Sequence, residues 1–119
     1  MMDLTNRIAL LQQAERADND GNQKEALGIL SRCLELYPSF SPARVLRGEI
    51  YARMGEMEQA VQELDEIIRS NPENIRARIL LTRVLAEAGR KQEAATHLEF
   101  LGFMMPENDP ALEELRELL

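Results

Sequence analysis

One residue interval recurs throughout this chain and limits what it can fold into. Prolines stand at Pro38, Pro72 and Pro106, each 34 positions from the next. Average residue usage would give roughly 0.1–0.3 such triplets by chance, whereas the chain has five. The other four triplets are Ala9, Ala43 and Ala77; Gly21, Gly55 and Gly89; Ala26, Ala60 and Ala94; and Leu30, Leu64 and Leu98. The chain is therefore a repeat protein with a 34-residue unit.

Each unit predicts two helices joined by a turn, because apolar residues recur at intervals of three and four rather than two. The periodic glycine ends the first helix, since glycine adopts the left-handed conformation that follows many helices. The periodic proline ends the second helix, since it lacks an N–H donor. The first helices are predicted over 7–20, 41–54 and 75–88, and the second helices over roughly 22–37, 56–71 and 90–105. The periodic alanines Ala26, Ala60 and Ala94 are expected where the two helices of a unit cross closely.

Local residue types predict helix starts and a terminal cap. Ser41 and Asp109 each precede a proline, as an N-cap before a first-turn proline does, and Asn22 approximates a capping box with Glu25.

Residues 109–119 continue the register as a further first helix, which would cap the array. Its leucines are expected to cover the third unit and its glutamates to face water: Leu112, Leu115 and Leu119, and Glu113, Glu114 and Glu117. Whether the chain is a complete protein or a domain of a longer one stays open.

The unit resembles the tetratricopeptide repeat over residues 7–108. The second copy has the signature spacing best, with Gly48, Tyr51, Gly55, Ala60, Leu64 and Pro72. The third copy has Leu81, Leu85, Gly89, Ala94, Leu98 and Pro106, and the first is weaker because Gln13 replaces a leucine. The family's tryptophan position is occupied by Leu10, Arg44 and Arg78. Those arginines are expected to lay their methylene stems on the core and keep the guanidinium in water.

This resemblance implies the fold and the general location of a site. The implied fold is an all-α solenoid with a right-handed superhelix. One domain over 1–119 would contain repeats at 7–40, 41–74 and 75–108 and a capping helix at 109–119. In the family, the first helices line a concave groove in which peptides bind.

Charge and hydropathy exclude several classes of partner. Fourteen lysines and arginines against 21 acidic residues give a net charge of -7. This disfavours nucleic acid and docking to anionic lipid. The longest apolar run, residues 100–105, is too short to span a bilayer, and the first residues lack the apolar region of a signal peptide. A soluble, cytoplasmic protein is therefore expected.

The chain contains no arrangement of residues typical of an enzyme. We find no phosphate-binding glycine loop, no His-Glu-x-x-His and no paired cysteines, so neither catalysis, a cofactor nor a metal site is expected. His97, the single histidine, is expected to be a partly exposed surface residue. Cys33 stands where the other units have Ile67 and Leu101, so it is expected to be a buried apolar thiol.

The first helices contain the candidate binding site. In this acidic chain, residues 41–54 have three arginines against Glu49, and residues 75–88 have three against Glu87. Helical spacing predicts one shared face, and its candidate residues are Leu11, Glu15, Val45, Glu49, Arg53, Arg76, Ile79 and Arg83. Leu11, Val45 and Ile79 would form an apolar stripe flanked by the arginines, which suit carboxylates. The favoured function is a non-enzymatic adaptor that binds a partner's peptide or helix bearing acidic groups.

Three alternatives remain open. In the first, Glu49 and Glu87 only pair with the arginines inside the chain, which contributes little. An apolar N-terminal edge suggests a homo-oligomerisation module, and its residues are Met1, Met2, Leu4, Ile8 and Leu11. The cluster Phe100, Phe103, Met104 and Met105 is expected to pack against the capping helix, with a partner-binding patch as the alternative.

One family subtype is disfavoured. Chaperone-binding members hold a peptide carboxylate with a clamp of basic and amide side chains. The corresponding positions are Leu11, Glu15, Leu46, Arg76 and Leu80. Only Arg76 has the required chemistry, so a clamp of that kind is not expected.

Overall fold

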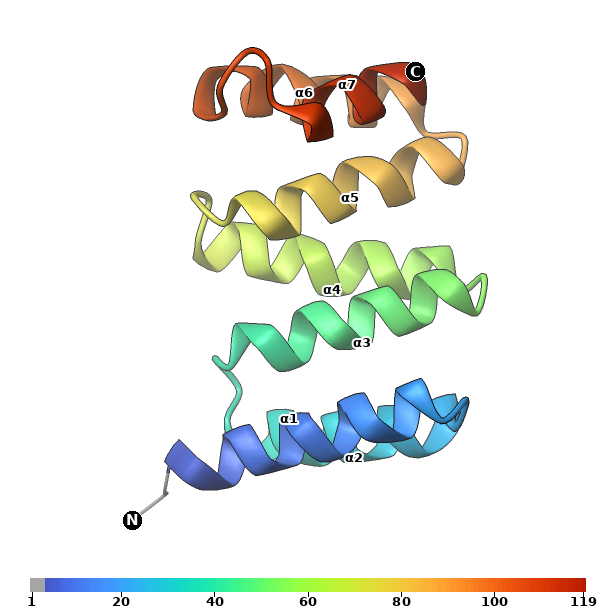
Figure 1. The fold of residues 1–119 in the computed structure, drawn as a ribbon, viewed down its shortest axis with the longest axis vertical. Helices are drawn as coiled ribbons and strands as arrows, with labels where there is room; N and C mark the ends of the chain where they lie inside the picture. Colours follow the sequence, from blue (N-terminus) through green and yellow to red (C-terminus); the bar gives the residue numbers. More distant parts are fainter. Residues whose placement is uncertain (1–3) are drawn as a thin grey trace.

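The computed structural model describes residues 4–119, which form seven helices and no strand over this range. The helices are α1 (Leu4–Asn19), α2 (Gln23–Leu36), α3 (Ser41–Arg53), α4 (Met57–Ser70), α5 (Ile75–Glu87), α6 (Lys91–Met104) and α7 (Pro110–Glu117). They follow one another along the long axis of the molecule, from α1 and α2 at one end to α6 and α7 at the other (Figure 1). The protein is therefore an all-α solenoid, as the repeat predicts.

The helix ends lie close to the periodic residues. Gly21, Gly55 and Gly89 have φ of 84°, 82° and 81° and are the residues with positive φ in the described part. An L side chain strains this conformation, which explains why glycine recurs there. The start of the first helix was predicted wrongly, because α1 begins at Leu4 rather than at residue 7. Residues 4–6 contain neither glycine nor proline, so nothing in them stops the helix at the repeat boundary.

The predicted N-caps are partly wrong. Asp109 caps α7 as expected, accepting a hydrogen bond from the Ala111 N–H at 2.9 Å. Asn22 makes no side-chain cap hydrogen bond, and Ser41 is the first residue of α3 rather than its N-cap, a position that Phe40 occupies. Sequence reasoning missed Asn74, whose side chain caps α5 by accepting from the Ala77 N–H at 3.0 Å.

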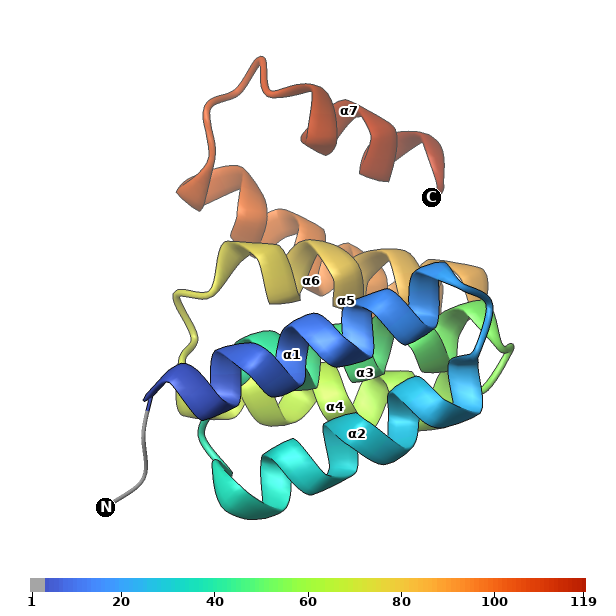
Figure 2. The ribbon, with the colours of Figure 1, turned by 60° about the horizontal axis from the view of Figure 1, so that its bottom comes forward.

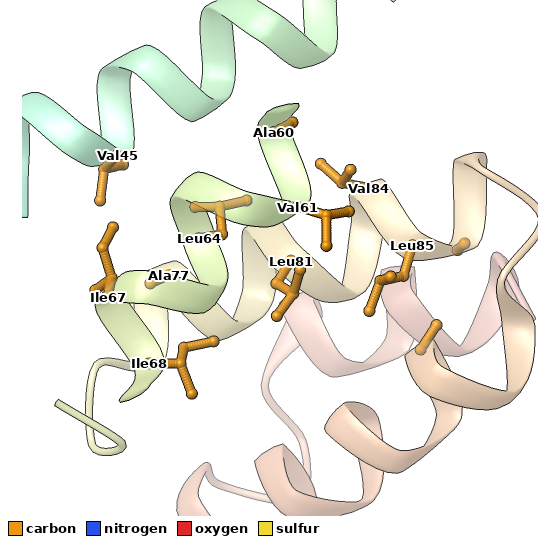
Figure 3. Packing of buried hydrophobic residues seen from close by; sticks show 12 residues of the cluster. Val45, Ala60, Val61, Leu64, Ile67, Ile68, Ala77, Leu81, Val84 and Leu85 are labelled. Carbon is orange, nitrogen blue, oxygen red and sulfur yellow. The ribbon is translucent and has the colours of Figure 1, made fainter. Parts of the chain in front are cut away.

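The core consists of clusters shared between neighbouring helices. The largest joins α3, α4, α5 and α6 and includes Leu64, Leu81 and Leu85 (Figure 3). Ala26, Ala60 and Ala94 are completely buried, as expected for residues at close crossings. A second close approach lies at Gly48, where an added Cβ would stand 3.3 Å from Leu64 Cγ.

The capping helix covers only part of the third unit. Leu112 and Leu115 are fully buried against Leu101 of α6, whereas Leu119 is 39% exposed, contrary to the prediction. Figure 2 shows α7 beyond the loop that follows α6, at the end of the array.

The aromatic residues of α6 do not pack as predicted. Met105 contacts the Leu101 cluster, but Phe100 is 43% exposed and Phe103 is 86% exposed. Phe103 is two residues from Leu101 on the helix and therefore lies on a nearly opposite side. Because α7 covers the Leu101 side, it leaves Phe103 uncovered.

In the part of the chain that the structure describes, no helix is long and apolar enough to cross a bilayer.

Candidate functional site

Two adjoining pockets lie along the first helices of the three units. The pocket between α1 and α3 has a volume of about 690 Å³, and the pocket between α3 and α5 has a volume of about 450 Å³. Glu49, Arg53 and Arg76 line both. We call the combined depression the first-helix groove. Its lining residues are Leu11, Glu15, Asp18, Asn19, Ser41, Pro42, Val45, Leu46, Gly48, Glu49, Ala52, Arg53, Leu64, Asn74, Arg76, Leu80, Arg83, Val84 and Glu87.

The groove contains all but one of the predicted site residues. The exception is Ile79, which packs with the Leu101 cluster under the capping helix. The apolar part of the groove therefore does not run through the third unit as a stripe. It is formed at the first two units by Leu11, Val45 and Leu46, and at the third unit by Leu80 and Val84.

Two arginines of α3 do not contribute to the groove. Arg44 Nη1 donates to Glu63 Oε2 on α4 at 3.3 Å, and Arg47 Nη2 donates to the other oxygen of the same carboxylate. Glu63 is only 12% exposed at its side chain, so one partly buried carboxylate holds both guanidinium groups. The basic residues of the groove are therefore Arg53, Arg76 and Arg83.

Ion pairs join neighbouring units across the groove. Arg53 donates from Nη1 and Nη2 to the two oxygens of Asp18 at 2.9 and 2.7 Å. This two-point contact raises the pKa of Arg53, chiefly through the hydrogen bonds. Arg76 Nη2 donates to Glu49 Oε1 at 2.9 Å. The predicted internal pairing thus holds for Glu49, and the pairing of Asp18 was missed because it spans 35 residues.

Arg83 differs from the other two basic residues. It lines the pocket between α3 and α5 and is partly exposed. Among the residues that the structure describes, it forms no ion pair, and neither does Glu87, one turn further along α5. Arg76 is paired, but its side chain remains 73% exposed. An incoming carboxylate would therefore find one unpaired guanidinium at Arg83 and one accessible guanidinium at Arg76.

Arg78 lies outside the groove and is buried, not solvated as predicted. It is 7% exposed. Its Nη2 donates to the Pro72 carbonyl at 3.0 Å, and its Cζ lies 4.0 Å from the centre of the Phe100 ring. Its Nη1 lies 3.0 Å from His97 Nδ1. Because a guanidinium only donates, Nδ1 accepts and His97 carries its proton on Nε2.

His97 and Cys33 are both structural residues in this arrangement. Burial, followed by the positive charge of Arg78, lowers the pKa of His97 below its usual value, which keeps the ring neutral near pH 7. Cys33 is completely buried, as predicted, and burial raises the pKa of its thiol. A buried thiol with a raised pKa is unreactive.

Comparison with known proteins places the chain among helical repeat proteins. The sequence model of the family described as "Anaphase-promoting complex, cyclosome, subunit 3" matches residues 19–101. A comparison with curated protein sequences found no match.

Solved structures have closely similar folds at low sequence identity. The first TPR of Spaghetti (RPAP3) bound to an HSP90 peptide has a TM-score of 0.86 at 18% identity, over 98% of this chain and 93% of that one. The second TPR domain of human RPAP3 in complex with an HSP70 peptide has a TM-score of 0.83 at 17% identity, over 96% and 95%. An O-GlcNAc transferase mutant from Thermobaculum terrenum has a TM-score of 0.84 at 23% identity, over all of this chain but 23% of that one.

Proposed function

Because this chain belongs to the tetratricopeptide repeat family, we propose that it is a non-enzymatic protein-interaction module. In this proposal residues 1–119 form one domain, and the first-helix groove holds a peptide or helix of a partner protein. The observation that carries the proposal is Arg83, a charged group in a pocket without an ion-pair partner among the described residues. A charge left available in a concave, partly apolar site favours a ligand of opposite charge.

The groove favours a particular ligand chemistry. Leu11, Val45 and Leu46 offer apolar contacts at the first two units, and Arg76 and Arg83 offer bidentate donors at the third. A segment that fits both would place apolar side chains over α1 and α3 and a carboxylate over α5. Arg53 takes a lesser role, since Asp18 already accepts from both of its terminal nitrogens.

The similar structures support an acidic ligand but not the same one. The HSP90 and HSP70 peptides named in those structures, SRMEEVD and SGPTIEEVD, both end in acidic and apolar residues. In this chain, Leu11, Glu15, Leu46 and Leu80 occupy clamp positions without basic or amide groups. We therefore propose an acidic segment that is recognised mainly at Arg76 and Arg83, rather than a chaperone tail.

Selection from a displayed library of random peptides tests this function. We expect wild-type protein to enrich peptides that combine apolar and acidic residues, and the variant Arg76→Glu/Arg83→Glu to lose them. For an enriched peptide, the double charge reversal should weaken binding at least about tenfold, because like charges then face each other across a partly desolvated site. Fluorescence anisotropy measures the affinity, and circular dichroism checks that the helices are retained.

A matched control separates groove binding from the change in net charge. Arg32→Glu/Arg69→Glu makes the same change in charge at exposed positions on α2 and α4, outside the groove. It should bind the enriched peptides as wild type does. Equal loss in both double variants, or no enrichment by wild type, would contradict the proposed function.

Homo-oligomerisation remains the second candidate, favoured by one observation. Ile8 on α1 is 47% exposed, and the other residues of the proposed edge include Leu11 in the groove. Met1 and Met2 lie outside the described residues, and the side chain of Leu4 is not described. Light scattering that finds dimers in wild type and monomers in Ile8→Ser would support this candidate, whereas monomers in both would exclude it.

A further inference from the structure

The outward side of α6 departs from the repeat in a way that points to a second binding surface. Two positions that carry charged residues in the earlier units carry phenylalanine here. Phe100 stands where α2 has Arg32 and α4 has Glu66, and Phe103 stands where they have Glu35 and Arg69. A side chain as exposed as Phe103, at 86%, leaves nearly all of its apolar area in water.

Small residues next to the phenylalanines leave room for a partner. Val61 and Ile68 of α4 are buried in the cluster that α4 shares with the next first helix, α5. The same positions of α6 carry Ala95 and Gly102, and both are exposed. A Cβ added at Gly102 would meet nothing within 4 Å. Where α5 covers these positions of α4, therefore, nothing in the described chain covers them on α6.

These residues form one continuous surface. We call it the α6 outer face and define it as Ala95, Thr96, Glu99, Phe100, Gly102 and Phe103, all of them exposed. Whereas α4 is sharply amphipathic, α6 is not, because apolar residues lie on its outward side as well as its inward side. Exposed apolar residues that form a patch often mark an interaction surface.

The charges around this face identify the kind of partner that fits it. Glu99 lies one turn before Phe103 on α6, and Glu107 stands in the loop between α6 and α7. Both are exposed, and neither forms an ion pair within residues 4–119. A second copy that meets this face with its own α6 outer face would bring like charges together. Lysines or arginines flanking an apolar ridge would instead pair with them.

We propose that the α6 outer face binds an amphipathic helix of another protein, with apolar residues on one side and lysine or arginine beside them. A helix is the occupant that the repeat favours, since α5 covers these positions of α4, whereas its counterpart α7 packs at Leu101 and leaves them exposed on α6. The partner's apolar side chains would enter the space at Ala95 and Gly102, and Phe103 would anchor the contact. This surface is separate from the first-helix groove. Its partner would be basic, whereas the ligand proposed for the groove is acidic.

A displayed library of amphipathic helices tests the proposal. Leucines are fixed at i, i+3, i+4 and i+7, and the flanking positions vary among lysine, glutamate and glutamine. Wild type should enrich lysine at the flanking positions. The variant Phe103→Ser, at an exposed site, should keep its fold and bind the enriched helices at least about tenfold more weakly. Glu99→Lys should also weaken binding of the enriched helices, and this loss of affinity should be larger at low salt than at high salt.

Control variants distinguish this surface from the groove and from self-association. Arg69→Ser changes the equivalent exposed position of α4, and Arg76→Glu/Arg83→Glu changes the groove, so neither should alter binding of the enriched helices. Enrichment of glutamate, or equal binding by wild type and Phe103→Ser, would overturn the proposal. So would a wild-type dimer in light scattering that Phe103→Ser converts to monomer, because a second copy would then occupy the face.

Discussion

At the scale of single residues, Arg78 shows how a buried charge is accommodated in this fold. Taking a charge out of water is costly unless its donors find acceptors. The guanidinium of Arg78 has the Pro72 carbonyl, the His97 ring nitrogen and the face of Phe100 as partners. Together they satisfy two nitrogens and cover one plane of the group. The positive charge of Arg78 also lowers the pKa of His97, in addition to the larger effect of burial.

The pKa of His97 should therefore lie below its usual 6.5 and rise when Arg78 is removed. In Arg78→Met the ring loses the neighbouring positive charge, while Asp65 and Glu93 still favour protonation. Because His97 is the single histidine, its NMR signal gives the pKa directly. Arg16→Met, in the first unit, is the control and should leave the value unchanged. An unchanged pKa in Arg78→Met would show that Arg78 does not act on the ring.

The same shift has a consequence for folding stability. The unfolded chain binds a proton at His97 more readily than the folded chain does, so the contribution of this residue is complete above about pH 6.5. It falls as the pH drops below that value towards the pKa of the folded state. Glutamine does not titrate, so in His97→Gln this part of the pH dependence of the free energy of unfolding should disappear. Urea titrations at a series of pH values measure it.

Repeat spacing predicts where residues stand along the helices but not which partners they find. It located Arg78 and His97, yet their contact joins side chains 19 residues apart, and nothing in the spacing indicates it. Ile79 occupies the same repeat position as Leu11 and Val45, but the capping helix covers it. Equivalent positions thus acquire different roles because the ends of a repeat array have different neighbours from its middle.

At the scale of elements, glycine and proline made the helix ends predictable. The residues that form side-chain N-caps were less predictable. Backbone restrictions of these two residues act locally and can be read from the sequence. A side-chain cap depends on one hydrogen bond that several neighbouring residues are able to make. Asn74 and Asp109 form such bonds in the structure, and Asn22 does not.

Two glycines inside helices should respond in opposite ways to alanine. Gly28 on α2 has nothing within 4 Å of an added Cβ, so Gly28→Ala should raise the free energy of unfolding by about 0.5–1 kcal/mol through helix propensity. In Gly48→Ala the Cβ would press on Leu64, which is fully buried, and the variant should be less stable than wild type. Urea denaturation measures both. Equal stabilisation by the two would mean that α3 and α4 do not approach closely at Gly48.

At the scale of the whole molecule, contacts reach only between helices that are one or two apart in chain order. Stability in such an array is a sum over units and their interfaces, so damage at one end should remain local. Leu115→Ala removes a fully buried side chain from the interface of α7 with α6. We expect a local loss of about 2–5 kcal/mol.

Hydrogen exchange shows whether that loss is local. In Leu115→Ala the amides of α6 and α7 should exchange faster, while those of α1 and α2 keep their protection. Leu118→Ala, at a position 40% exposed, is the control and should leave both ends unchanged. Faster exchange throughout all seven helices would instead indicate that the chain opens as one cooperative unit.

The single cysteine and the single histidine lie in opposite ends of the array. Cys33 is enclosed in the core of the first unit, and the ring of His97 is held by Arg78 in the third. A thiol reagent reaches Cys33 only when the first unit opens, and the histidine resonance shifts only when the third unit does. The unmodified chain therefore contains one spectroscopic reporter for each end. The opening rates of the two ends are measurable separately in one sample, without an introduced label.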